Sequence, residues 1–167
     1  MRRREFVLAL PLLGSLHAFA DDKAPYSGIW ELNVPYRGSQ GRSKIVMMKQ
    51  VGDSLTLKDL ETGQEYAGQV NPAGITFPLN VKARDSQESV TASFAGTMTQ
   101  GSLKGNTSVD GANYEWAASK LTSVWLCANH NPIHMAKSRE QMSEFTRENK
   151  CEGWHRARPE AFARETK

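Results

Sequence analysis

The chain has 167 residues, with 21 Lys or Arg against 18 Asp or Glu, so its formal net charge is +3. Residues 1–20 hold three of the basic and one of the acidic residues, which leaves +1 (18 − 17) for the rest. A nearly neutral chain lacks the basic stripe that marks nucleic-acid-binding proteins, so we expect no nucleic-acid partner. The remaining 147 residues (167 − 20) fit one domain with a sizeable core.

Residues 1–20 have the pattern of a cleavable signal peptide. Arg2–Arg4 precede a short apolar run, and Ala18–Ala20 supply the small-x-small motif before Asp21. The run is too short to span a bilayer, so we expect no membrane span. Arg3–Phe6 is also similar to the twin-arginine export pattern, with an ordinary Sec signal as the alternative. Both routes predict a bacterial protein that is periplasmic or secreted.

Residues 27–120 contain eight short segments in which apolar and polar side chains alternate, separated by turn residues. Alternation with a period of two is typical of half-buried strands, and short connections favour antiparallel neighbours. We predict a mainly β fold, an eight-stranded antiparallel up-and-down barrel over residues 21–120, with a two-sheet sandwich as the alternative. Pro78 cannot donate to a ladder, so we expect it where the barrel is incompletely paired.

Gly28-Ile29-Trp30 resembles the G-x-W motif of lipocalin-like barrels. Three further stretches look like small exported lipocalin-like domains of bacteria: Gln50–Leu55, Phe94–Thr97 and Leu103–Gly105. The resemblance covers residues 27–120. It implies that Trp30 caps one end of the barrel and contacts a basic residue of the last strand, a role that Lys120 suits through a cation–π contact. It also implies an interior able to hold one small apolar ligand.

The predicted inward face of the barrel is rich in large apolar side chains. Ile45 is expected there, and we predict ligand binding by Trp30, Leu32, Met47, Tyr66, Phe77, Phe94 and Trp116. In the alternative hypothesis these side chains pack against each other, because protein interiors fill to high density.

Catalytic signatures such as G-x-S-x-G and H-E-x-x-H do not occur in the sequence, so we expect a non-enzymatic protein. Four carboxylates fall in or beside turns, where we expect solvated turn formers: Asp53, Asp59, Glu61 and Asp85.

Residues 121–167 have a different pattern, which predicts a loop and helix packed on the barrel. Ser138-x-x-Gln141 has the form of a capping box at the start of a helix over residues 139–150, with Met142 and Phe145 facing inward. Cys127 and Cys151 are the two cysteines, and an exported chain favours a disulfide between them. Such a bridge would stabilise the segment by roughly 3 kcal/mol.

Two alternatives remain for this segment. Cys127-x2-His130 and Cys151-x3-His155 have spacings similar to zinc sites, with His134 as a substitute ligand. Met135 would suit copper, and in a combined form of this alternative the three histidines bind a metal or anion beside a bridged cysteine pair. In the other alternative, one cysteine is a nucleophile with a histidine as its base.

The leading functional hypothesis is therefore non-enzymatic binding of a small, mostly apolar molecule inside the barrel. The second is a protein that binds or traffics zinc or copper through its C-terminal Cys and His residues. The third is an interaction or inhibitor module that contacts its target through surface loops such as Arg37–Arg42.

Overall fold

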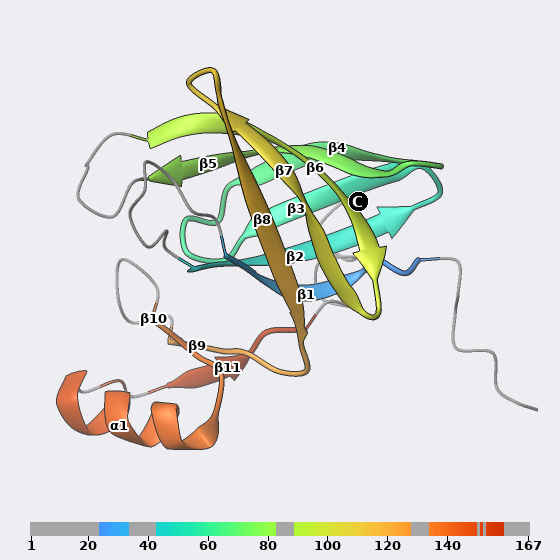
Figure 1. The fold of residues 1–167 in the computed structure, drawn as a ribbon. Helices are drawn as coiled ribbons and strands as arrows, with labels where there is room; N and C mark the ends of the chain where they lie inside the picture. Colours follow the sequence, from blue (N-terminus) through green and yellow to red (C-terminus); the bar gives the residue numbers. More distant parts are fainter. Residues whose placement is uncertain are drawn as a thin grey trace, which may run out of the picture.

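The structure, a computed structural model, describes residues 24–33, 43–82, 89–127, 134–149, 151 and 153–158. The predicted signal peptide, His130 and the loop Arg37–Arg42 lie outside these residues. Eight strands form a closed antiparallel barrel in which each strand pairs with its neighbours in sequence and β8 returns to β1 (Figure 1). The strands are β1 (Gly28–Asn33), β2 (Ser43–Val51), β3 (Ser54–Asp59), β4 (Glu65–Asn71), β5 (Gly74–Lys82), β6 (Ser89–Thr99), β7 (Ser102–Val109) and β8 (Ala112–Leu121). The predicted barrel is confirmed, and the sandwich alternative is wrong.

A smaller unit follows the barrel and is called the C-terminal module. It consists of β9 (Trp125–Cys127), β10 (His134–Ala136), α1 (Arg139–Asn149) and β11 (Trp154–Arg156). Its strands form a separate sheet in the order β10-β9-β11, and α1 lies beside it at one side of the barrel (Figure 1). The helix was expected from the sequence, whereas the three short strands were not. Among the described residues, no helix is long and apolar enough to cross a membrane.

The inward side chains of the barrel form its main core, as the alternation predicts. In β5, Ile75, Phe77 and Leu79 are buried, while Thr76 between them is exposed. The rings of Phe77 and Phe94 stack with centroids 5.1 Å apart. The Trp116 ring meets both rings edge-on, at centroid distances of 5.7 and 5.6 Å. Offset and edge-on ring pairs of this kind stabilise a core beyond the area they bury.

Gly96 makes room for the indole of Trp116, and Gly105 lets the backbones of β6 and β7 approach closely. Gly96 and Gly105 lie opposite each other in β6 and β7. A Cβ atom on Gly96 would overlap the Trp116 ring, and one on Gly105 would overlap the carbonyl group of Ala95. The indole N–H donates to the carbonyl oxygens of Ala95 and Asn106, at 3.0 and 3.1 Å. Gly96 thus lets a large aromatic side chain sit against the barrel wall with its polar atom hydrogen-bonded.

Trp30 and Lys120 are paired in register and in contact near the end of the barrel where β1 begins and β8 ends. Trp30 is fully buried, and its indole N–H donates to the carbonyl oxygen of Tyr26 at 2.8 Å. The Lys120 ammonium lies 5.5 Å from the centre of the Trp30 ring. Gly28 has a φ of 141°, and a Cβ atom there would lie 2.6 Å from Cε of Lys120. The cation–π contact expected from the G-x-W resemblance is therefore present, and Gly28 leaves space for the lysine.

A second core lies outside the barrel, between β1, β2 and the C-terminal module. Its buried members are Ile29, Ile45, Met47, Leu60, Val124 and Ala157. The prediction that Ile45 and Met47 face the barrel interior is wrong, because Val46 and Met48 do so instead. Residues 45–48 are all apolar and all buried, so alternation alone does not select the inward face of β2. The module covers what would otherwise be the solvent side of this strand.

Besides this core, a covalent bond and polar contacts hold the C-terminal module. The predicted disulfide joins Cys127 to Cys151, with Cα atoms 6.3 Å apart. The backbone N–H of Ala157 donates to the carbonyl oxygen of Val124 at 2.8 Å. An ion pair joins the Lys137 ammonium to the carboxylate of Glu31 on β1.

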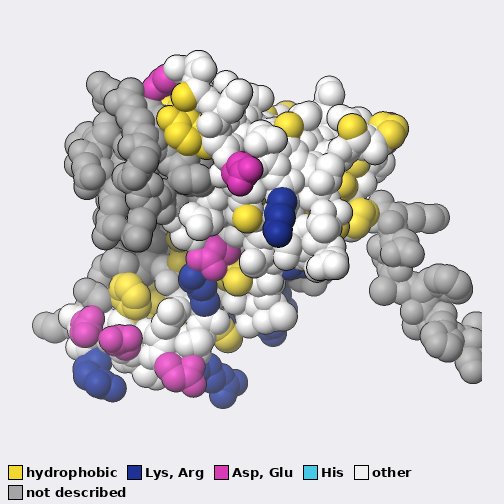
Figure 2. All heavy atoms as spheres, viewed as in Figure 1, with side chains coloured by type: hydrophobic (Ala, Val, Ile, Leu, Met, Phe, Trp, Pro, Cys, Tyr) yellow, Lys and Arg dark blue, Asp and Glu magenta, His cyan; other side chains and the backbone are white. Residues whose placement is uncertain are grey.

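The helix α1 is capped as predicted but is mostly exposed. The backbone N–H of Gln141 donates to the Ser138 hydroxyl at 3.2 Å, and the Gln141 side chain accepts from the N–H of Lys137 at 2.8 Å. Only Met142 and Phe145 are half-buried among the helical side chains described. Figure 2 shows acidic and basic side chains interleaved over this part of the surface. This face therefore carries no single-sign charge stripe.

Candidate functional site

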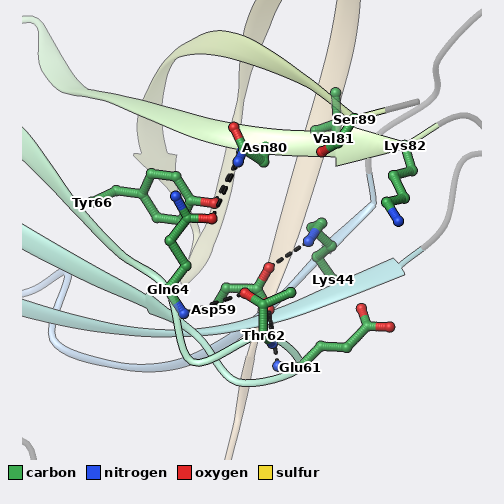
Figure 3. Close-up of a pocket in the computed structure, with 10 residues that line it drawn as sticks. All are labelled: Lys44, Asp59, Glu61, Thr62, Gln64, Tyr66, Asn80, Val81, Lys82 and Ser89. Carbon is green, nitrogen blue, oxygen red and sulfur yellow. Dashed lines mark hydrogen bonds and ion pairs between the residues drawn. The ribbon is translucent and has the colours of Figure 1, made fainter. Parts of the chain in front are cut away.

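A pocket opens at the end of the barrel opposite Gly28 and Lys120. This end, called the mouth, is where β1, β3 and β5 finish and β2, β4 and β6 begin. The pocket has a volume of about 140 Å³. Most of its lining residues are polar, although their apolar atoms supply the larger share of its surface (Figure 3); they are Lys44, Asp59, Glu61, Thr62, Gln64, Tyr66, Asn80, Val81, Lys82 and Ser89.

One side of the pocket is a gap between β4 and β5. The two strands pair through only three residue pairs, from Asn71 with Gly74 to Gln69 with Thr76. Continued register would place Pro78 opposite Ala67, but proline has no N–H to donate. Beyond this point β5 continues to pair with β6 alone. The expectation that Pro78 marks an incompletely paired part of the barrel is confirmed.

Side chains bridge the gap in place of backbone hydrogen bonds. The backbone N–H of Asn80 donates to the Tyr66 hydroxyl oxygen at 3.4 Å. The Asn80 side-chain amide donates to Oε1 of Gln64 at 3.2 Å, and its Oδ1 accepts from the Thr91 hydroxyl at 2.7 Å. Figure 3 shows Tyr66 and Gln64 converging on Asn80 across the gap. These bonds position three polar side chains at the entrance of the pocket.

Asp59 and Lys44 form a buried ion pair on the inner wall. Asp59 is fully buried, and its Oδ1 accepts from the backbone N–H groups of Glu61 and Thr62 at 2.9 and 3.4 Å. Its Oδ2 pairs with the Lys44 ammonium. The expectation that Asp59 is solvated is wrong. It does bond to its own turn, as a turn aspartate should, but it shares the inward face of β3 with the buried Leu57.

The turn that carries Asp59 also contacts the second core. Leu60 follows Asp59 and is buried with Ile45 and Val124. Its backbone N–H donates to the carbonyl oxygen of Ile45 at 3.0 Å. Neighbouring residues of one turn therefore face the pocket and the C-terminal module.

Tyr66 is the titratable group of the pocket whose environment changes its proton affinity most clearly. Burial raises the pKa of Tyr66 above its ordinary value, and the negative charge of Asp59 raises it further. The hydrogen bond from the Asn80 N–H acts in the opposite direction and offsets part of this increase. Tyr66 is therefore protonated at neutral pH and keeps an O–H group to donate.

The seven predicted ligand-binding residues are distributed over three places. Met47 lies in the second core, outside the barrel. Tyr66 lines the mouth pocket. The other five belong to the main core: Trp30, Leu32, Phe77, Phe94 and Trp116. The three rings at its centre contact one another, as the alternative hypothesis of a packed interior predicts.

The C-terminal cysteines are joined to each other. A bridged cysteine offers no thiolate, so neither the Cys2His2 zinc site nor the cysteine nucleophile is compatible with this disulfide. His155 is exposed on β11, His134 pairs in register with Cys127, and His130 lies outside the described residues. Within the described part of the chain, no three His, Cys, Asp or Glu residues gather as a metal site would require. A site made of the three histidines stays an untested prediction.

Most pocket residues were not predicted from the sequence. A usable signal was nevertheless present, because Lys44 alternates with Val46, and Asp59 alternates with Leu57. Lys44 lies near the start of β2 and Asp59 at the end of β3, so both lie at the same end of the barrel. Two opposite charges at inward positions there indicate a buried ion pair. Gln64 and Asn80 carry no comparable signal, because their roles depend on the gap that begins at Pro78.

Comparison with known proteins gives no relative for this site. No family model matches the chain, and no curated protein or solved structure shows significant similarity to it. The functional argument therefore rests on the geometry of the pocket and the chemistry of its lining.

Proposed function

We propose that this protein is an exported, non-enzymatic binding protein that holds a small molecule in the pocket at the mouth of its barrel. The observation that carries the proposal is the gap between β4 and β5, which leaves a pocket of about 140 Å³ in an otherwise paired wall. An engineered protein cavity of about 150 Å³ binds benzene, so the ligand is about the size of a single ring.

The lining suits a ligand with an apolar body and a polar end. The Tyr66 ring and Val81 offer apolar surface, and lysines such as Lys44 and Lys82 add their aliphatic stems. We therefore retain the prediction that the ligand is mostly apolar, but we propose that it binds in the mouth pocket and not at the centre of the barrel. The closed barrel supplies rigid strands on which these groups are already positioned before binding.

Export is part of the proposal and has two supports. One is the signal-like pattern of residues 1–20, and the other is the disulfide between Cys127 and Cys151, which is typical of oxidising compartments. Expression of the full chain in a bacterial cell should yield a periplasmic or secreted protein whose intact mass corresponds to a start at Asp21. Recovery of the uncleaved chain from the cytoplasm only would contradict this part.

Binding is tested by titrating the ¹⁵N-labelled protein with a panel of neutral and charged single-ring compounds and following its amide resonances. We expect shifts at Asn80, Val81 and Ser89, which line the pocket. Gln64→Trp should place an indole at the entrance and abolish these shifts. Gln69→Trp is the matched control, because this exposed residue of β4 does not line the pocket, and it should leave them unchanged. A panel that causes no shifts at the pocket contradicts the proposal.

A further inference from the structure

Several oxygen atoms around the pocket already accept hydrogen bonds. The Asp59 carboxylate accepts from two backbone N–H groups and from Lys44. Oε1 of Gln64 accepts from Asn80, and the Thr62 hydroxyl accepts from the N–H of Gln64 at 3.3 Å. A ligand that brings additional hydrogen-bond donors would have to compete with these contacts.

Several donors of the pocket lack such partners. The Tyr66 oxygen accepts from Asn80, so its own O–H remains to be donated. An ammonium group has three N–H donors, and Lys44 places one contact on Asp59. Within the described residues, no acceptor contacts the ammonium of Lys82 or the hydroxyl of Ser89. Tyr66, Lys82 and Ser89 therefore each offer a hydrogen-bond donor to a ligand.

The formal charges of the lining residues sum to zero. Lys44 and Asp59 neutralise each other as a pair, which leaves Lys82 and Glu61 as the other ionisable side chains besides Tyr66. Figure 3 shows the Glu61 carboxylate directed away from Tyr66 and Asn80. Since burial and Asp59 both raise the pKa of Tyr66, its hydroxyl stays a neutral donor at physiological pH.

We infer that the pocket selects a small planar molecule carrying a carboxylate, which accepts from Tyr66, Lys82 and Ser89 while the ring lies against Val81. This inference rests on the proposed function and names the chemical class of its ligand. Hydrogen bonds from a cation or a hydroxyl to a carboxylate are stronger than those between neutral groups, so the charged group determines the preference. A cation of the same shape would meet an ammonium group and donors that it cannot use.

The test uses three probes of nearly equal shape, which are benzoate, benzamide and benzamidinium, with formal charges of −1, 0 and +1. Each is titrated into the oxidised mature protein while the amide resonances of Asn80 and Ser89 are followed. We expect benzoate to bind at least about tenfold more tightly than benzamide, with benzamidinium weakest of the three. Added salt should weaken benzoate binding and leave benzamide binding unchanged.

Two substitutions locate the preference in the pocket. Lys82→Gln and Tyr66→Phe should each weaken benzoate binding by about three- to tenfold and change benzamide binding less. Lys104→Gln removes an exposed lysine of β7 that does not line this pocket, and it should have no effect. Amide spectra of the free variants establish that each keeps the fold.

The outcomes separate the two proposals. Binding of all three probes at the pocket with equal affinity, or tightest binding of benzamidinium, overturns the carboxylate inference and leaves the proposed function standing. If none of the three binds at the pocket but other single-ring compounds do, the carboxylate inference also fails alone. The absence of binding by any compound of the wider panel contradicts both.

Discussion

The barrel and the C-terminal module differ in what holds them together. Strands of the barrel pair on both sides, apart from the gap between β4 and β5, and enclose a continuous apolar core. The module has three strands of three residues each and a helix in which, among the side chains described, only Met142 and Phe145 are half-buried. Burial of apolar surface is the dominant favourable term in folding. The comparison teaches that the barrel needs no covalent support, whereas the module depends on its disulfide and on the outer face of the barrel.

The largest expected effect comes from the centre of the barrel core. Phe94→Ala removes a fully buried ring that contacts Phe77 and Trp116, so it should lower the free energy of unfolding by about 3–5 kcal/mol. Phe145→Ala is the matched control, because it makes the same change on a half-buried ring of α1. Urea unfolding followed by tryptophan fluorescence measures both. Equal losses would contradict the difference between the two regions.

An intermediate effect is expected from the disulfide, and only in the module. Its cysteines are 24 positions apart, so Cys127→Ala with Cys151→Ala should destabilise the closed ring by about 3 kcal/mol in the chain-entropy model. Amide hydrogen exchange should accelerate in β9 and β11 and remain unchanged in β5 and β6. Acceleration spread evenly over the barrel would show that the bridge supports the whole molecule.

The smallest effect is expected at the ion pair between the two regions. Lys137 and Glu31 are both partly exposed, so Lys137→Met should lower the free energy of unfolding by no more than about 0.5 kcal/mol at pH 7. Burial alone would raise the pKa of Glu31, but hydrogen bonds from Lys137 and Ser43 outweigh it and lower the pKa below its ordinary value of 4.5.

The pH dependence of this pair has a defined sign. A carboxylate with a lowered pKa in the folded protein stabilises it above the ordinary pKa, and this contribution disappears as the pH falls through the folded value. A double-mutant cycle with Glu31→Gln and Lys137→Met should thus show coupling at pH 7 that declines as the pH is lowered below 4.5. Coupling that stays constant down to the lowest pH at which the protein is folded would mean that the contact is not ionic.

The sequence was most informative where one face of a strand is apolar and the other polar. The inward face of β5 was predicted because Ile75, Phe77 and Leu79 alternate with polar residues, and Pro78 indicated the gap because its missing N–H is a local property. Alternation was ambiguous in β2, where Met47 and Met48 are both buried against different partners. The position of Asn80 across from Tyr66 could not be predicted, because it depends on how far β4 and β5 diverge beyond that proline.

Leu60 has a thermodynamic consequence for both regions. It packs in the second core with Ile45 of β2 and with Val124, which directly precedes the module, while its neighbour Asp59 faces the pocket. Coupling free energies between two sites are reciprocal. If a bound molecule stabilises the ordered module through this turn, the ordered module therefore increases the binding free energy at the pocket by the same amount. If reduction of the disulfide loosens the module, the affinity of the pocket would fall by a certain factor. Binding of the small molecule would lower the equilibrium constant for loosening of the module by the same factor.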